Sequence, residues 1–264
     1  EELQAELIAM PLQCGEETYV DDKTTPVETF WQMLLDGVNI KTSLPSPDTF
    51  VQKFKAAKEA GDEVICILIA SKLSGTYQGA MLAKQIVDYD GIHVIDAGHA
   101  AASVAEKMLV LAACRMRDQG CTAEEIVRRL EQLRGSVRLI ACLDTLEYLA
   151  RGGRLPAAVA SIGTKLQLKP IIVFGEDGEI QVVKKCMGSK RAMRDMTEMV
   201  TERRIDPEYP VIPIFAQNDG NCQEYMAALK NAGCEGTMQA PQGIGATIGS
   251  YIGPGGYGIV FVEK

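Results

Sequence analysis

The stretch Glu63-Val-Ile-Cys-Ile-Leu-Ile-Ala70 decides the fold. It is a continuous apolar run rich in β-branched residues, which is typical of a buried parallel strand. A short polar loop from Ser71 to Thr76 follows it, and then a helical pattern over about 77–88. The same alternation continues on both sides, with helical patterns at 26–36, 47–60, 101–119 and 122–134 and strand patterns at Ile92–Asp96 and Val137–Cys142. Alternation of this kind predicts a parallel α/β sheet.

The two ends of the chain give weaker patterns. Residues 1–7 resemble the end of a helix, and Ile8–Gln13 resembles a short strand. Near the C-terminus, the glycine-rich stretch Gly243–Gly258 predicts short strands and tight turns and does not open a helix. It also lacks the lysine of a phosphate-binding loop, so we expect it to pack closely against ligand or chain instead.

The second half has a different organisation. Pro170–Phe174 and Glu179–Lys185 flank Glu176-Asp-Gly178, which is a hairpin signal with Asp-Gly at the turn. The remaining patterns are helices at 189–203 and 223–232, a strand at 211–216 and two short strands near the C-terminus. We therefore expect two domains: residues 1–142 form a parallel-sheet α/β domain, and residues 143–264 an α+β domain with a largely antiparallel sheet.

Composition excludes several classes of protein. Of 264 residues, 47% are hydrophobic and 23% charged, which is ordinary for a globular chain. The net charge of −8 argues against a nucleic-acid partner. No apolar run approaches the roughly 20 residues that span a bilayer, and no secretory signal is evident. Eight cysteines without a CxxC pair suggest a reducing cytoplasm, and the presence of only two histidines argues against a multi-histidine metal site.

The loop Ser71-Lys-Leu-Ser-Gly-Thr-Tyr77 is the first candidate site. It connects the end of a buried strand to the start of a helix, where open α/β sheets bind ligands. Free N–H groups at a helix start suit an anion. Ser74 and Thr76 add hydroxyl groups, and Gly75 allows the backbone to come close. The same residues are equally well explained if Ser74 or Thr76 simply caps the helix.

Two further segments carry polar groups. Lys41-Thr-Ser-Leu-Pro-Ser-Pro47 places two hydroxyls before a proline-stiffened turn, although a plain loop with an N-cap at Ser46 explains it too. In Gly152-Gly-Arg154, either Arg151 or Arg154 could hold an anion, or both could simply be solvated. No Gly-x-Ser-x-Gly elbow is present, but Lys72 beside Ser71 and Ser74 leaves a serine nucleophile conceivable.

Taken in order, these segments resemble the DegV family of bacterial fatty-acid-binding proteins, with a likeness that runs from about residue 11 to the C-terminus. The matching stretches are Lys41-Thr-Ser-x-Pro-Ser46, Ser71–Tyr77, Val94-Ile-Asp-Ala97, Leu143-Asp-Thr-Leu-Glu-Tyr-Leu149, Gly152-Gly-Arg154, Leu168-Lys-Pro-Ile171 and Ile252-Gly-Pro-Gly255. Each motif is weak alone, but seven in the same order make a specific signal.

The resemblance implies a two-domain carrier with a long-chain fatty acid between its domains and no other cofactor. The carboxylate would be held by Thr42 and Ser74, with Gly75 and Thr76 assisting at the helix start. Some members of the family are the lipid-carrying subunit of a fatty acid kinase and present the carboxylate to a separate ATP-binding subunit. The resemblance therefore implies a binding protein rather than an enzyme.

Two positions depart from the family pattern. Members open with a strand ending in Asp-Ser that lines the head-group end, and this sequence starts after that point. We therefore expect that part of the sheet and pocket to be absent from it. Members also commonly have His where this chain has Tyr251, whose phenol can donate a hydrogen bond but cannot titrate as imidazole does.

A carrier and an enzyme differ in the reactivity of Ser74. The rival to a fatty-acid carrier is a lipid hydrolase or acyltransferase that uses Ser74 as nucleophile, and a third interpretation is a regulatory protein with a purely structural lipid. We predict that a fluorophosphonate probe leaves Ser74 unlabelled, because a carrier does not activate its serine. Stoichiometric labelling of Ser74, read by peptide mass spectrometry, would establish the enzyme instead.

Overall fold

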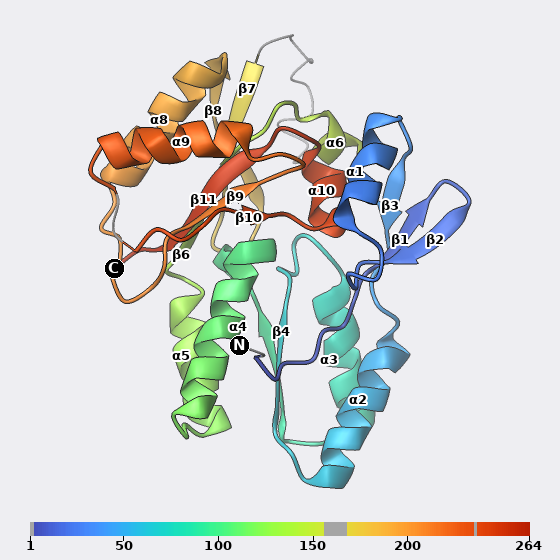
Figure 1. The fold of residues 1–264 in the computed structure, drawn as a ribbon. Coiled ribbons are helices and arrows are strands. Elements are labelled where there is room, and N and C mark those ends of the chain that lie inside the picture. The colour runs from blue at the N-terminus through green and yellow to red at the C-terminus, as the bar shows by residue number, and fades with distance from the viewer. Residues whose placement is uncertain (1–2, 156–167, 235–236) are drawn as a thin grey trace.

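The computed structural model describes residues 3–155, 168–234 and 237–264, and these build three sheets (Figure 1). A two-stranded parallel sheet belongs to the first half of the chain, and a six-stranded mixed sheet belongs mostly to the second. A small three-stranded sheet is formed by residues near the N-terminus. The α/β class, with a parallel sheet followed by a largely antiparallel one, is confirmed.

The parallel sheet pairs the decisive apolar run with the strand that follows it. Val64–Leu68 (β4) aligns with Ile92–Asp96 (β5) from the Val64–Ile92 pair to the Leu68–Asp96 pair. Two helices of the first half pack together beside β5, and the next two pack over the other face (Figure 1). These helices are α2 (Pro47–Ala60), α3 (Thr76–Val87), α4 (Ser103–Asp118) and α5 (Ala123–Leu133), and a short 3-10 turn, η1 (Gly98–Ala100), precedes α4.

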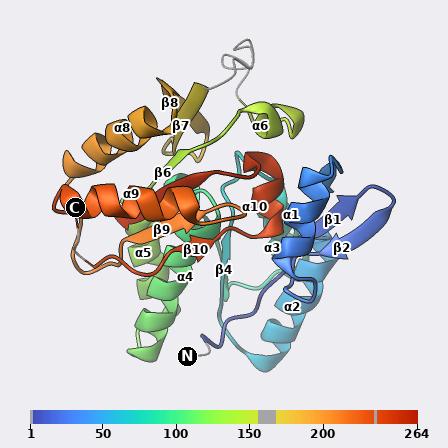
Figure 2. The same cartoon turned by 45° about the horizontal axis from the view of Figure 1, so that its top comes forward.

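The six-stranded sheet has the order β10-β9-β11-β6-β7-β8. All neighbours in it are antiparallel except β10 and β9. Its strands are β6 (Val137–Cys142), β7 (Leu168–Phe174), β8 (Ile180–Met187), β9 (Ile212–Phe215), β10 (Gln242–Gly243) and β11 (Tyr257–Val262). Helices α8 (Ser189–Thr201) and α9 (Gly220–Asn231) cover one face, and the other face is turned toward the first half of the chain (Figure 2).

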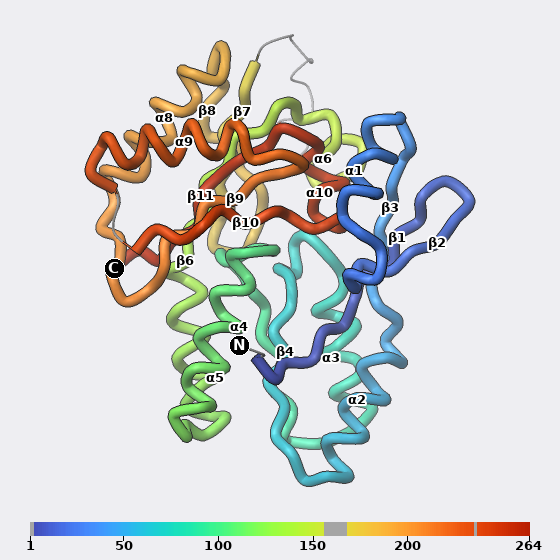
Figure 3. Tube along the Cα trace, in the orientation of Figure 1, coloured from blue at the N-terminus to red at the C-terminus, as the bar shows by residue number. Residues whose placement is uncertain are grey.

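The small sheet has the order β2-β1-β3 and lies beside two helices from opposite ends of the chain (Figure 3). Its strands are β1 (Pro11–Cys14), β2 (Glu17–Val20) and β3 (Ile40–Thr42), and the two adjoining helices are α1 (Val27–Leu35) and α10 (Ala246–Ile252). A third helix, α6 (Glu147–Arg151), packs against α10. α10 contacts both α1 and β3, so residues near position 40 meet residues near position 250.

Most elements form where the sequence patterns predict them. The hydroxyl of Ser46 accepts a hydrogen bond from the Asp48 amide at the start of α2, as expected for an N-cap. Thr122 and Glu125 form the expected capping box at the start of α5. The Asp-Gly turn joins β7 to β8. Local side-chain chemistry therefore fixes these helix starts and the hairpin.

The predicted orientation of the strand Val137–Cys142 is wrong. The strand exists, but it is antiparallel to β7 and β11 and does not extend the β4–β5 sheet. Five of its six residues are buried because neighbouring strands and helices cover it on all sides. A central strand of a mixed sheet carries the same continuous apolar run as a parallel strand, so composition cannot distinguish the two.

Two further predictions at the chain ends are wrong. Residues 3–7 form no helix, and the Arg117 guanidinium donates hydrogen bonds to the carbonyls of Leu3 and Gln4 instead. The strand predicted over Ile8–Gln13 does form, but as β1 it begins at Pro11 and ends at Cys14. The glycine-rich stretch contains the helix α10. Asp21 stabilises its first turn by accepting hydrogen bonds from the amide and hydroxyl of Thr247, a contact that local sequence does not show.

Apolar residues of both halves form one core. It contains Leu12, Ile95 and Met108 from the first half, and Leu139 and Ile172 from the large sheet. A separate core fills the space between that sheet and α8 and α9. Because the first core is shared, the two halves meet through side-chain packing and not through a linker alone.

All eight cysteines are free thiols. Burial raises the pKa of Cys66, Cys142 and Cys222 to about 12. These three thiols stay protonated and behave as small apolar side chains. In the part of the chain that the structure describes, helices long and apolar enough to cross a membrane are not found.

Glu106 is a half-buried residue of α4, a helix that contacts β4. Burial raises its pKa to about 8, although a hydrogen bond from the Ser103 amide opposes the shift. Because the native state favours the protonated form, Glu106 contributes stability below the pKa of an unfolded glutamate. That stability is lost as pH rises through about 8.

We predict that the free energy of unfolding falls less in Glu106→Gln than in the wild type when the pH is raised from about 5.5 to about 8.5. The difference between the two falls should be on the order of 1–3 kcal/mol. Urea unfolding at both pH values measures this. Glu224→Gln, at an exposed position on α9, is the control and should leave the pH dependence unchanged. Equal pH dependence in wild type and Glu106→Gln would contradict the assignment.

Candidate functional site

Thr42 and Tyr251 meet although 209 residues separate them. The Thr42 hydroxyl, at the end of β3, lies 2.5 Å from the Tyr251 hydroxyl on α10. β3 is fixed by its pairing with β1, and α10 by Asp21 at its first turn. The contact therefore depends on the small sheet and on the C-terminal helix together. Each hydroxyl retains acceptor capacity for a further hydrogen bond.

The ring of Tyr251 is held from two sides. A Cβ at Gly152 would lie 2.3 Å from the ring, so only glycine permits this approach. The Arg154 guanidinium lies over the ring, 5.0 Å from its centre. This is the distance of a cation–π contact. The Gly152-Gly-Arg154 motif thus positions the phenol, which is a role that the sequence did not indicate.

Ser74 and Thr76 form a second pair of hydroxyls at the start of α3. Their oxygens lie 2.8 Å apart, and the Ser74 hydroxyl accepts a hydrogen bond of 3.3 Å from the Thr76 amide. Gly75 occupies the N-cap position and Thr76 is 3% exposed. Neither Ser74 nor Thr76 is the N-cap residue, and the Ser74 hydroxyl is half-buried at the positive end of the helix dipole.

Three contacts connect the two hydroxyl pairs. Arg154, which covers Tyr251, donates a hydrogen bond of 3.0 Å to the Leu73 carbonyl next to Ser74. Leu44, two residues after Thr42, packs against Gly75. Met10, which precedes β1, lies 3.9 Å from the Thr76 hydroxyl through its sulfur atom. We call Thr42, Ser74, Thr76, Tyr251 and Arg154 the hydroxyl cluster.

The structure thus brings Thr42 together with Tyr251, and Ser74 with Gly75 and Thr76. Within the described residues, Thr42 and Ser74 form no hydrogen bond with each other. Arg154 connects the two pairs instead, because it contacts both the Tyr251 ring and the Leu73 carbonyl. From the sequence, Arg154 was predicted only as one of two possible anion ligands. Met10 and Leu44 were missed because an apolar residue in a loop gives no signal of its own.

Half-buried apolar side chains adjoin the hydroxyl cluster. Leu73, Leu146, Leu155 and Ile248 all pack against the core that both halves share, and the ring of Tyr148 joins them. The hydroxyls therefore stand at the rim of a continuous apolar interior. An arrangement with polar groups at one end and apolar side chains behind them suits an amphipathic ligand.

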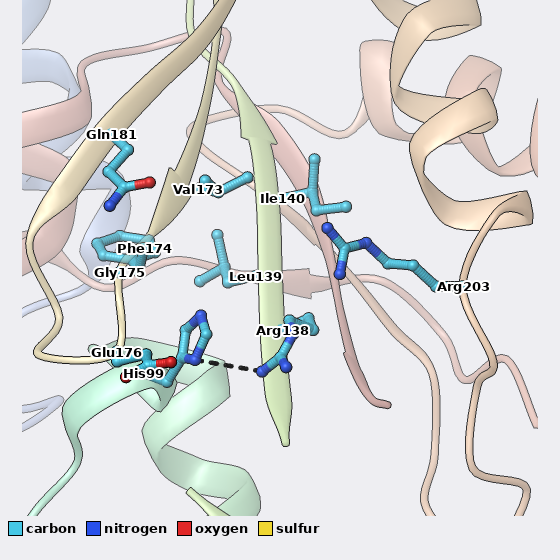
Figure 4. Close-up of a pocket in the computed structure, with 10 residues that line it drawn as sticks. All are labelled: His99, Arg138, Leu139, Ile140, Val173, Phe174, Gly175, Glu176, Gln181 and Arg203. Carbon is cyan, nitrogen blue, oxygen red and sulfur yellow. Dashed lines mark hydrogen bonds between the residues drawn. The ribbon is translucent and has the colours of Figure 1, made fainter. Parts of the chain in front are cut away.

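Two clefts lie elsewhere on the molecule, and neither is lined by Thr42, Ser74 or Tyr251. One, of about 370 Å³, lies between η1, β6 and the β7–β8 hairpin (Figure 4). There the Arg138 guanidinium donates a hydrogen bond of 3.2 Å to Nδ1 of His99. Burial and the Arg138 charge lower the pKa of His99. The second cleft, of about 430 Å³, is flanked by Lys184 and Arg191 and by the buried Asp195.

Comparison with known proteins identifies relatives over almost the whole chain. The sequence model of the family described as uncharacterised protein, DegV family, matches residues 1–264. A DegV domain-containing protein of Caldanaerobacter subterraneus subsp. tengcongensis is 35% identical over 98% of this chain and 91% of its own length.

Solved structures share the fold. A fatty-acid-binding DegV family protein from Thermus thermophilus superposes with a TM-score of 0.87 at 27% identity, covering 99% of this chain and 93% of that one. The fatty acid kinase B3 protein of Streptococcus pneumoniae, loaded with linoleic acid, superposes with a TM-score of 0.82 at 22% identity. That match covers 97% of this chain and 90% of the other.

We predict that Tyr251→Phe lowers the free energy of unfolding by about 0.5–1.5 kcal/mol, because Thr42 loses its partner. Tyr148→Phe is the matched control, since the Tyr148 hydroxyl forms no hydrogen bond with any described residue. Chemical denaturation of the two variants measures the difference. Equal losses in both would mean that the hydrogen bond between Thr42 and Tyr251 does not stabilise the fold.

Proposed function

Because the chain belongs to the DegV family, we propose that it binds a long-chain fatty acid and carries it, with the carboxylate at the hydroxyl cluster. One observation supports this placement most directly. Hydroxyls from β3, α3 and α10 gather at the rim of an apolar core that both halves share. A fatty acid has one polar end and one long apolar chain, and the site has the same two parts.

The carboxylate would accept hydrogen bonds from Thr42 and Ser74. The Tyr251 hydroxyl can donate its proton to the Thr42 oxygen, and the Thr76 hydroxyl can donate its proton to the Ser74 oxygen. The protons of Thr42 and Ser74 are then available to the carboxylate. Gly75 lets the carboxylate approach the free amides at the start of α3, whose positive dipole end favours an anion. Arg154 adds a positive charge to the same cluster.

The tail would supply most of the affinity. Burial of one CH₂ group contributes about 0.8 kcal/mol, so roughly fifteen carbons supply about 12 kcal/mol as an upper bound. A charge-assisted hydrogen bond adds about 1.5–3 kcal/mol. Leu73, Leu146 and Ile248 lie where the first carbons of the tail would enter the shared core. The hydroxyls therefore set orientation more than strength.

Both halves of the chain contribute residues to the proposed site. Residues 1–142 supply Thr42 and Ser74, while residues 143–264 supply Tyr251 and Arg154 and close over the tail. The hydroxyl cluster contains no histidine or carboxylate that could act as general base toward Ser74, and its partner is another hydroxyl. The site therefore fits a binding protein rather than a serine hydrolase.

A carrier of this kind would present its bound fatty acid to a partner protein. A bound carboxylate at the rim of the core would be accessible to a second protein, whereas the tail would not. We propose that an ATP-binding fatty acid kinase subunit phosphorylates the acid in this position. The likeness in fold to the fatty acid kinase B3 protein supports such a partner.

We predict that the purified protein carries a fatty acid of about 14 to 20 carbons, because such a ligand leaves a dry site slowly. Mass spectrometry of an organic extract identifies it. A parallel extract of an unrelated protein purified from the same cells controls for carry-over. An extract with no enrichment over this control, combined with no binding of added palmitic acid, would contradict the proposed function.

We also predict that Thr42→Ala with Ser74→Ala weakens palmitic acid binding by about 2–4 kcal/mol. Binding of hexadecanol, which lacks the carboxylate, should change much less. Ser43→Ala is the control, because Ser43 adjoins Thr42 but lies outside the hydroxyl cluster. An unchanged dissociation constant for palmitic acid in the double variant would remove both residues from the site.

A further inference from the structure

The tip of the β7–β8 hairpin touches the loop that carries Ser74. Gly178 stands at this tip with a φ of +84°, a conformation that favours glycine. A Cβ at Gly178 would lie 2.3 Å from the Ala70 Cβ and 2.8 Å from the Gly98 carbonyl oxygen. The tip therefore fits against the ends of β4 and β5 only because residue 178 has no side chain.

Ala70 transmits this contact to Ser74. The Ala70 carbonyl accepts hydrogen bonds from the Leu73 amide at 2.9 Å and from the Ser74 amide at 3.2 Å. A displacement of Ala70 therefore displaces the backbone of Ser74 directly. Asp96 stiffens the same region, because its carboxylate accepts from the amides of Ser71 and Gly98.

An ion pair adds little to this contact. Lys72 and Asp177 lie 3.6 Å apart, with side chains 58% and 51% exposed. Exposed pairs of this kind contribute about 0–1 kcal/mol. The close packing of Gly178 on Ala70, and not the charge, therefore determines how near the hairpin tip can come.

Part of the hairpin tip borders open space. Gly175 and Glu176 line the cleft of about 370 Å³ (Figure 4), although the Glu176 carbonyl also lies close to Gly98. Movement of the tip into this cleft would meet less resistance than movement toward Ala70. The contact with Ala70 and Gly98 is thus what holds the tip against the Ser74 loop.

We propose that the β7–β8 hairpin tip holds Ser74 in its binding position, with Gly178 as the positioning residue. This inference rests on the proposed function, since it concerns the carboxylate contact made by Ser74. When the tip moves toward the cleft, Ala70 and Ser74 lose their support and the grip on the carboxylate weakens. The hairpin then couples the second half of the chain to ligand release from the first.

A double-mutant cycle between Gly178→Ala and Ser74→Ala tests the proposal. With Ser74 present, Gly178→Ala should weaken palmitic acid binding by about tenfold, the equivalent of one hydrogen bond. In the Ser74→Ala background, it should weaken binding by less than about twofold. Hexadecanol binding should change little in either background. Equal losses in both backgrounds, or for both ligands, would overturn the proposal.

Gly188→Ala is the matched control. Gly188 lies at the far end of β8 with a φ of +82°, and a Cβ there would meet nothing within 4 Å. Gly188→Ala carries strong backbone strain, because a ψ of 159° at this φ is a conformation that essentially only glycine adopts, but it creates no contact with Ala70. If Gly188→Ala weakens palmitic acid binding as much as Gly178→Ala, the effect comes from strain and the proposal is wrong.

Asp177→Asn provides a second variant if Gly178→Ala does not fold. It removes the charge that faces Lys72 but keeps the packing of Gly178 on Ala70, so palmitic acid binding should stay within about twofold of the wild type at low and at high salt. A larger loss at low salt would mean that the charge holds the tip, and it would overturn the proposal.

Hydrogen exchange separates this proposal from the proposed function. The Ser74 amide should exchange about tenfold faster in Gly178→Ala than in Gly188→Ala, with or without ligand. Absence of palmitic acid binding in the wild type would refute the proposed function, and the exchange rate would still decide the positioning role. Equal exchange at Ser74 in the two variants would overturn that role.

Discussion

The apolar core shared by the two halves is the constraint on which the rest of the structure depends. It joins side chains of the small sheet, of β5 and α4, and of the large sheet into one packed body. Because this core fixes β3 relative to α10, the hydroxyls of Thr42 and Tyr251 meet across 209 residues. The same packing puts the Ser74 loop within reach of Arg154. A site assembled from such distant segments exists only in the folded chain.

Within the site, hydrogen bonds and apolar burial contribute very different amounts of free energy. The hydrogen bonds of the hydroxyl cluster contribute about 0.5–1.5 kcal/mol each, whereas apolar burial of a long chain amounts to about ten times as much. Two glycines adjust the geometry by allowing approaches that no side chain would permit. Gly152 accommodates the Tyr251 ring, and Gly178 accommodates Ala70. In the proposed function, the polar groups would therefore orient a ligand whose affinity comes mainly from its tail.

Local patterns predicted the helices, the hairpin and the loop that carries Ser74, because capping residues and apolar runs act over a few positions. Tertiary contacts decided the rest. The apolar run Val137–Cys142 gave no sign of its antiparallel pairing, and α10 depends on Asp21, which lies 226 residues from Thr247. The pairing of Thr42 with Tyr251 was not visible for the same reason. Resemblance to a family, and not periodicity, pointed to those two positions together.

The most direct test of where the carboxylate lies is a nuclear Overhauser experiment with palmitic acid labelled at carbon 2. If the carboxylate lies at the hydroxyl cluster, the protons on that carbon should contact the methyl group of Thr42 and the β protons of Ser74. Contacts to His99 or Arg138 in the hairpin cleft, with none to Thr42 or Ser74, would contradict this placement.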